Sequence, residues 1–227
     1  MSKFFEALER AAQEQALRHH PGPSTPRSGQ GPTVPEPIPY EVLRSSLEGP
    51  RTAPDGLDEH LVSLVEPASF EAEQYRALRQ LIERLHKSTA LSIVAVSSPT
   101  VADGKTTTSI NLAGALAQAP DARVLLVDTD LRAAALAPRL GFNESVRPGL
   151  VDAILDANLT LAAVVHARPS LNLSVVPAGR VPSSPYEVLK SPRFGELLAE
   201  ARTRYDYIIL DTPPLVSVPD CRSSRNG

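Results

Sequence analysis

The residues of this chain that could do chemistry begin with Gly104, Lys105 and Thr106, which follow a β-branched apolar run at residues 91–97. A strand, a short loop and Gly-Lys-Thr at the start of a helix form the layout of a phosphate site, because the free N–H groups of a helix N-terminus bind anions. The Lys105 ammonium would contact nucleotide phosphates, and the Thr106 hydroxyl would ligate Mg²⁺. Pro99 replaces the first glycine of the G-x-x-x-x-G-K-[ST] pattern, so the motif alone also fits an ordinary helix start with a solvated lysine.

Three aspartates strengthen the phosphate-site interpretation. Asp128 and Asp130 end a second apolar run, "LLVDTDLR", and Asp211 ends a further one, "IILDTPP". Ligands of open α/β sheets bind at the carboxyl ends of the strands, so we expect these carboxylates to converge on the loop. Burying them together is costly unless a cation pairs with them, and Mg²⁺ takes oxygen ligands of this kind. One aspartate alone would be read as a helix cap, but three in this order favour a Mg²⁺-nucleotide site.

The elements that would position these residues alternate along the chain. Apolar runs typical of buried strands occupy residues 91–97, 123–128, 171–176 and 205–211. Helices are predicted at residues 70–87, 105–117, 150–157 and 194–204. This alternation predicts an α/β fold with a parallel sheet and helices on both of its faces.

The helix predicted at residues 70–87 has two different faces. An apolar stripe is expected to face the core, and it consists of Leu78, Leu81, Ile82 and Leu85. Charged residues are expected on the opposite, exposed face, and they are Glu73, Arg76, Arg79 and Glu83. Exposed ion pairs contribute only about 0–1 kcal/mol, so these charges by themselves indicate a solvated helix face.

The first 60 residues differ in composition from the rest. Residues 2–18 show helical spacing of apolar side chains, which fits either a docking helix or a frayed terminal helix. Residues 21–54 hold 9 of the 22 prolines, which is typical of a disordered linker. We therefore predict an N-terminal helix at 1–20, a linker at 21–60 and a phosphate-loop domain at 61–227.

Composition argues against several classes of protein. The formal net charge of −3 carries no basic excess, so nucleic acid is not expected as a partner. No apolar run reaches the about 20 residues of a transmembrane helix, and the N-terminus lacks the apolar core of a secretory signal. The single cysteine suits a reducing compartment. We expect a cytoplasmic protein that reaches a membrane only through a partner.

Taken together, these motifs resemble those of the bacterial tyrosine kinases (BY-kinases) of exopolysaccharide and capsule export, within the P-loop partition-ATPase-like superfamily. The resemblance covers residues 66–220. "LLVDTDLR" matches the Walker A′ pattern of the family and "IILDTPP" matches its Walker B pattern. Glu73, Arg76 and Arg79 stand at the spacing of the Glu-x-x-Arg-x-x-Arg motif that family members use for ring assembly. Thr100 stands where partition ATPases carry an extra lysine, which favours the kinase branch.

The resemblance implies transfer of the γ-phosphoryl group of ATP to tyrosine, with Mg²⁺ as cofactor. The implied catalytic residues are Lys105, Asp128 and Asp130, of which Asp130 would activate the tyrosine hydroxyl. The implied nucleotide-binding residues are Ala102, Asp103, Gly104, Lys105, Thr106 and Thr107. The implied metal ligands are Thr106, Asp128 and Asp211, and the implied oligomer interface is Glu73, Arg76 and Arg79. The implied partners are a membrane polysaccharide copolymerase, or chain-length regulator, and further copies of the chain at the inner membrane.

The sequence departs from the family pattern after Walker B. Family members continue with further strands and a tyrosine-rich tail, whereas this sequence ends soon after Asp211, so we expect a C-terminally incomplete kinase domain. Two alternatives stay open: a partition-type (MinD-like) ATPase switch that releases free phosphate, and an inactive nucleotide-binding or scaffold chain.

Overall fold

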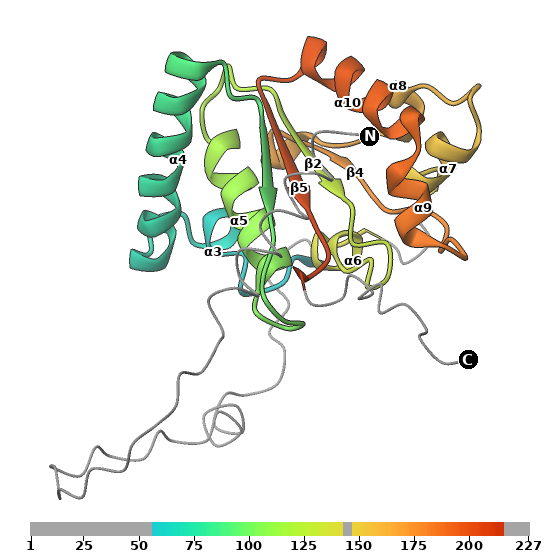
Figure 1. The fold of residues 1–227 in the computed structure, drawn as a ribbon. Helices are drawn as coiled ribbons and strands as arrows, with labels where there is room; N and C mark the ends of the chain where they lie inside the picture. Colours follow the sequence, from blue (N-terminus) through green and yellow to red (C-terminus); the bar gives the residue numbers. More distant parts are fainter. Residues whose placement is uncertain (1–55, 143–146, 216–227) are drawn as a thin grey trace, which may run out of the picture.

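The computed structural model describes residues 56–142 and 147–215, which form a sheet between two layers of helices (Figure 1). The five strands lie in the order β1-β5-β2-β4-β3. Their bounds are β1 Ile93–Val96, β2 Val124–Asp128, β3 His166–Arg168, β4 Leu173–Val176 and β5 Tyr207–Asp211. Neighbouring strands run parallel except β3, which is antiparallel to β4. The predicted α/β class is confirmed.

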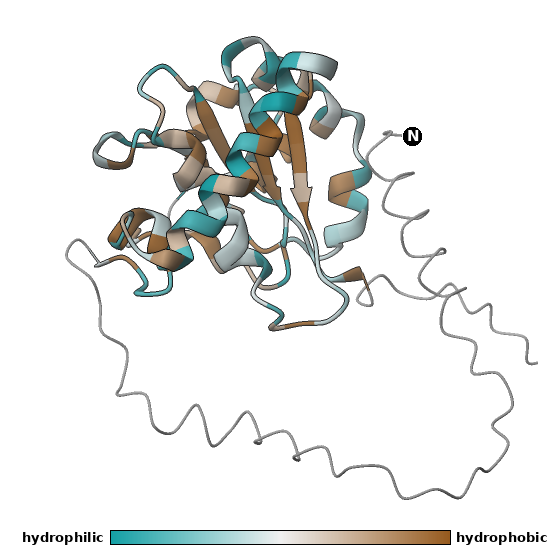
Figure 2. Ribbon diagram, turned by 90° about the vertical axis from the view of Figure 1, so that its left-hand side faces the viewer, coloured by the Kyte–Doolittle hydropathy of each residue, from teal (hydrophilic) through white to brown (hydrophobic). Residues whose placement is uncertain are grey.

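Helices cover both faces of the sheet (Figure 1). One layer contains α3 Val62–Val65, α4 Phe70–Thr89, α5 Lys105–Ala117 and α6 Leu136–Arg139, and the other contains α7 Leu150–Leu155, α8 Leu161–Val164, α9 Pro185–Lys190 and α10 Pro192–Arg204. Alternate strand residues serve the two layers: Leu126 and Ile209 pack on the α5 side, and Leu125 and Ile208 pack on the α10 side. Figure 2 shows hydrophobic strands behind helices of mixed hydropathy.

The strands and the helix that carry the predicted site form where the sequence predicts them. Each of the four predicted strands is present in a shorter form, and α5 has the predicted bounds. The short β3 was not predicted, because its residues do not form an apolar run. It is joined to β4 by the 3₁₀ turn η2 Pro169–Leu171. β1 is not buried on both faces as predicted: Ala95 is exposed, because β1 pairs only with β5 within the described residues.

Helix α4 buries a different face from the one predicted. Of the four residues in the apolar stripe only Ile82 is buried, while Leu78, Leu81 and Leu85 are 37%, 44% and 38% exposed. The buried side of the helix is instead completed by the small Ala72. The expected apolar-in orientation is therefore wrong for three of its four leucine and isoleucine positions.

The physical reason is a polar contact between α4 and α5. Arg79 Nη1 donates to Ala115 O at 3.1 Å, and Arg79 Nε donates to Glu83 at 2.6 Å. Ala115 lies in the last turn of α5, where carbonyl groups have no N–H donor inside the helix. Satisfying this carbonyl turns Arg79 and Glu83 toward α5, so their predicted placement on an exposed face is corrected to half-buried.

The packed domain begins before the predicted boundary at residue 61. Leu57 and Leu61 are both buried in the layer of α5. Residues 56–60 therefore belong to the domain and not to the linker. The predicted N-terminal helix and the rest of the predicted linker, residues 1–55, lie outside the described residues. In the described ranges, no helix is both long enough and apolar enough to cross a membrane.

Candidate functional site

The loop between β1 and α5 presents backbone amides at the predicted phosphate position. Ala102 and Gly104 have φ angles of 66° and 81°, in the left-handed region that glycine adopts without strain. Helix α5 begins at Lys105, and its first hydrogen bond runs from Thr108 N to Gly104 O at 2.8 Å. The N–H groups of residues 105–107 therefore have no acceptor within the helix and suit an anion.

Asp103 organises the loop through Thr100. Its two carboxylate oxygens accept hydrogen bonds from Thr100 N and Thr100 Oγ1, each at 2.8 Å. These bonds hold the pKa of Asp103 below its ordinary value. Ser98 Oγ also donates to Thr100 O at 2.7 Å. The loop thus closes on its own polar groups around Pro99, the residue that replaces the usual first glycine.

Lys105 and Asp130 form a buried ion pair. The distance from Lys105 Nζ to Asp130 Oδ2 is 2.7 Å, and the two side chains are only 9% and 5% exposed. The structure thus brings together the predicted phosphate-binding lysine and the predicted base for the tyrosine hydroxyl. Because the pair joins them directly, an incoming phosphate would compete with Asp130 for the ammonium of Lys105.

Asp128 and Asp211 are direct register partners at the ends of β2 and β5. Asp128 Oδ1 accepts from Asp130 N at 3.1 Å, and its Oδ2 accepts from Leu136 N at 3.4 Å, so this carboxyl group also shapes the turn after β2. Burial, together with the nearby charge of Asp211, raises the pKa of Asp128 to about 8. Without a cation, Asp128 is therefore mostly protonated at neutral pH.

Asp211 has the features of a cation ligand. It is fully buried, and burial raises its pKa although hydrogen bonds from Thr106 and Ser109 oppose the rise. Ser109 Oγ donates to Oδ1 at 3.0 Å, while Oδ2 is buried without a hydrogen-bond partner in the described residues. A buried carboxylate oxygen without a partner is costly unless a cation or an ordered water reaches it.

The residues at this edge fit Mg²⁺ bound jointly with a nucleotide. No group of three or more His, Cys, Asp and Glu side chains within the described ranges could hold a metal ion unaided. Mg²⁺ is usually held by one or two carboxylates, substrate phosphates and water, so a complete protein cage is not required. Thr106, Asp128 and Asp211 supply an appropriate set of oxygen atoms next to the phosphate loop.

The prediction of site residues from the sequence omitted one residue at the site and included three that lie away from it. Ser109 was missed, although its position one helical turn after Lys105 was a usable signal. Glu73, Arg76 and Arg79 lie on α4 and not with the loop or the strand ends. There Arg76 pairs with Glu73 and donates to Pro67 O, and Arg79 bonds to α5. The role of these three residues in an oligomer interface stays a prediction.

A mostly parallel sheet, with a lysine-containing loop before α5 and aspartates at adjacent strand ends, defines a P-loop nucleotide-binding domain. A family model described as an AAA domain matches residues 92–221. Tyrosine-protein kinase YwqD of Bacillus subtilis is 33% identical over 170 residues, which cover 75% of this chain and 70% of YwqD. Together these matches place the chain in the bacterial tyrosine-kinase family.

Further relatives agree with this family membership. Tyrosine-protein kinase wzc of Salmonella typhimurium is 34% identical over 160 residues, 70% of this chain but only 22% of wzc. The kinase domain of the Escherichia coli tyrosine kinase ETK has a TM-score of 0.66 at 29% identity, covering 78% of this chain and 68% of that domain. The VpsO kinase domain has a TM-score of 0.57 at 35% identity, covering 66% and 73%. The chain thus spans most of YwqD and of these kinase domains, but about a fifth of wzc.

Proposed function

We propose that this chain is an ATP-dependent protein-tyrosine kinase that transfers the γ-phosphoryl group of ATP to a tyrosine hydroxyl. The observation that carries the proposal is the convergence of Lys105, Asp128, Asp130 and Asp211 beside the free amides of α5. Phosphoryl transfer depends on positioning and charge neutralisation more than on covalent chemistry by the protein, and this edge of the sheet offers both. The names of YwqD, wzc and ETK, each a tyrosine kinase, support the same reaction.

The buried ion pair must separate before phosphoryl transfer, which sets the sequence of steps. Lys105 leaves Asp130 to contact the β- and γ-phosphates, while the amides of residues 105–107 bind phosphate oxygens. Its departure frees the Asp130 carboxylate to accept the proton of the tyrosine hydroxyl. The tyrosine oxygen then forms a bond to the γ-phosphorus as the bond to the ADP oxygen breaks.

Thr106, Asp128 and Asp211 would hold Mg²⁺, directly or through water. The unpartnered, buried Oδ2 of Asp211 supports this assignment. When bound, Mg²⁺ would neutralise the charge that develops on the phosphates. Asp128 must lose its proton to serve as a ligand, so metal binding and deprotonation of Asp128 are coupled.

The proposed biological setting is the regulation of exopolysaccharide or capsule polymerisation and export. The partner would be a membrane polysaccharide copolymerase that brings the chain to the inner membrane, and further copies of the chain would supply acceptor tyrosines. The support for this setting is the family membership of residues 92–221.

The first experiment compares thermal melts of the protein with and without Mg²⁺-ATP, for wild type and Lys105→Met. Ligand at about 100 times its Kd adds roughly 2.7 kcal/mol, which at this size raises Tm on the order of 5–10 °C. We expect this rise in wild type and none in Lys105→Met, each measured against its own nucleotide-free melt. A cooperative wild-type melt that Mg²⁺-ATP does not shift would contradict the proposal.

Product analysis then separates the alternatives. Phosphotyrosine formed from ATP, and lost in Lys105→Met, is the expected result. Release of free phosphate without phosphotyrosine would instead identify a partition-type ATPase switch. Binding of Mg²⁺-ATP with neither product would identify a nucleotide-dependent scaffold.

A further inference from the structure

The segment Gly56–Val65, here called the lead-in segment, is fastened to the phosphate-loop helix α5 by a buried amide. Asn111 on α5 is only 1% exposed. Its Nδ2 donates to His60 O at 2.9 Å and to Thr107 O at 3.0 Å, and its Oδ1 accepts from Ser63 N at 2.8 Å. The lead-in segment is therefore held against the same helix whose first turn faces the nucleotide site.

Arg139, at the end of α6, makes a second link between the lead-in segment and α5. Its Nη1 donates to Thr107 Oγ1 at 2.7 Å and lies 3.4 Å from Asp58 Oδ2. Asp58 N also donates to Arg139 O at 3.0 Å. One guanidinium thus connects three elements: the helix after the Walker A′ turn, the lead-in segment and the first turn of the phosphate-loop helix.

The position of the Arg139 charge points to an anion. The N-terminus of a helix carries partial positive charge, so a cation beside the first turn of α5 is unfavourable unless negative charge is close. Asp58 supplies some of that charge, but its contact is a long 3.4 Å. A phosphate group bound to the amides of residues 105–107 would supply the remaining negative charge, because these N–H groups belong to that first turn.

We propose that Arg139 is a positioning residue for nucleotide binding: it holds the Thr107 side chain, and with it the first turn of α5, in the phosphate-binding conformation. This inference rests on the proposed function, because it concerns the same phosphate loop. It adds a residue outside the Walker motifs, and it makes Asp58 of the lead-in segment part of the support of the loop.

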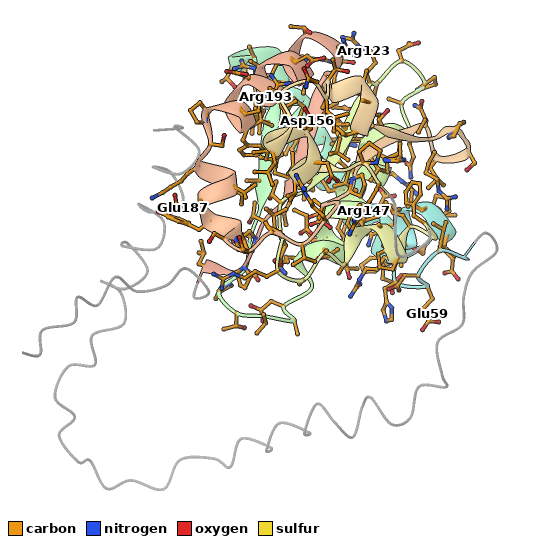
Figure 3. The ribbon with its side chains drawn as sticks, turned by 90° about the vertical axis from the view of Figure 1, so that its right-hand side faces the viewer. Glu59, Arg123, Arg147, Asp156, Glu187 and Arg193 are labelled. Carbon is orange, nitrogen blue, oxygen red and sulfur yellow. The ribbon has the colours of Figure 1, made fainter. Side chains whose placement is uncertain are left out.

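The test measures the Kd for Mg²⁺-ATP by isothermal titration calorimetry. Loss of a charge-assisted hydrogen bond in Arg139→Met should weaken binding about tenfold. Arg204→Met is the matched control, because Arg204 also forms an ion pair, with Glu200 at 3.0 Å, and is 50% exposed against 36% for Arg139. Arg204 ends α10 and lines the same pocket as Arg123. Arg123 lies at the opposite end of the molecule from Glu59 of the lead-in segment (Figure 3). The Kd of Arg204→Met for Mg²⁺-ATP should equal that of wild type.

Two further variants distinguish positioning from a merely structural role. In a Thr107→Val background, Arg139→Met should weaken binding less than it does in wild type, because Arg139 acts through the Thr107 hydroxyl. Arg139→Lys keeps the charge and one donor direction, so its Kd should lie between those of wild type and Arg139→Met. A structural arginine would instead lower Tm and leave the Kd of the folded fraction unchanged.

The outcomes separate this inference from the proposed function. Wild type that binds no Mg²⁺-ATP would overturn both. Wild type and Arg139→Met with equal Kd, or an undiminished effect of Arg139→Met in the Thr107→Val background, would overturn the positioning role alone. Should Arg139→Met fail to melt cooperatively, Arg139→Lys decides: a Kd equal to that of wild type overturns the inference, and a weaker one supports it.

Discussion

At the scale of single residues, the charged groups of the candidate site lie in two pairs, and a bound nucleotide would rearrange both. Lys105 and Asp130 form an ion pair of 2.7 Å inside the protein, whereas Asp128 and Asp211 end adjacent strands in direct register. Removing one member of the first pair leaves a buried charge uncompensated, and ionising both carboxyl groups of the second pair is costly. Both arrangements give consequences that can be measured on the nucleotide-free protein.

Removing Lys105 should leave the buried Asp130 carboxylate without its ion-pair partner. Lys105→Met is expected to lower the free energy of unfolding by about 3–5 kcal/mol, because Asp130 loses its ion-pair partner while its side chain remains buried. Adding Asp130→Asn to Lys105→Met should recover most of this loss. Urea unfolding of the four members of this double-mutant cycle measures the coupling, and strictly additive effects would refute it.

Asp128 should make the stability of the nucleotide-free protein depend on pH. Its pKa is about 8 when folded and near 3.8 when unfolded, so between these values the folded state binds more protons. The free energy of unfolding should therefore fall as pH rises from about 4 to about 8, and the contribution of Asp128 should level off above that. Asp128→Asn cannot titrate and should show a smaller fall. Urea unfolding between about pH 5 and pH 8 without Mg²⁺ makes the comparison, and equal slopes would count against the raised pKa.

At the scale of elements, α4 shows that an apolar stripe does not by itself fix the buried face of a helix. Ile82 is 4% exposed, whereas its neighbour Leu81 is 44% exposed. Ile82→Ala should cost about 2–5 kcal/mol through a lost core contact and the resulting cavity, and Leu81→Ala should cost less than about 1 kcal/mol. Chemical unfolding of the two variants tests the orientation of the helix. A larger loss for Leu81→Ala would mean that α4 packs as the stripe predicts.

The connection before α7 depends on two glycines that approach closely. A Cβ on Gly149 would lie 2.4 Å from Gly179 N and 2.6 Å from Pro177 O, both of them backbone atoms. Gly149→Ala should therefore destabilise the protein by at least about 1–3 kcal/mol. Gly195→Ala is the control: a Cβ there meets nothing within 4 Å, and alanine in a helix is favoured over glycine by about 0.5–1 kcal/mol. Thermal melts should move in opposite directions.

At the scale of the whole molecule, the helical layer that contains α5 includes a segment distant from α5 in the sequence. The lead-in segment contributes Leu57 and Leu61 to the α5 layer and satisfies the buried amide of Asn111. A chain shortened to begin at Glu66 should thus be less stable than one beginning at Gly56, by more than about 3 kcal/mol from the two leucines alone. Urea unfolding of the two shortened chains gives this difference. Equal midpoints and slopes would show that the lead-in segment is not part of the folded unit.

The sequence by itself determined the α/β class, the bounds of α5 and the convergence of the site. Strands buried in a parallel sheet read as apolar runs, and a helix start after Gly-Lys-Thr is a local signal. Asp128, Asp130 and Asp211 could be brought to one edge because parallel strands share the edge at which their carboxyl ends lie. These inferences need only local patterns and one rule of topology.

Only the tertiary structure decided which side chains become partners. The pairing of Lys105 with Asp130, the direct register of Asp128 with Asp211, the contact of Arg139 with Thr107 and the turn of α4 toward Ala115 all join residues from different elements. Such contacts depend on the rotation and register with which elements pack, and a sequence pattern leaves both open because several packings satisfy the same hydrophobic spacing. The bond from Arg79 to the Ala115 carbonyl in the last turn of α5 accompanies a rotation of α4 that leaves Leu78, Leu81 and Leu85 exposed.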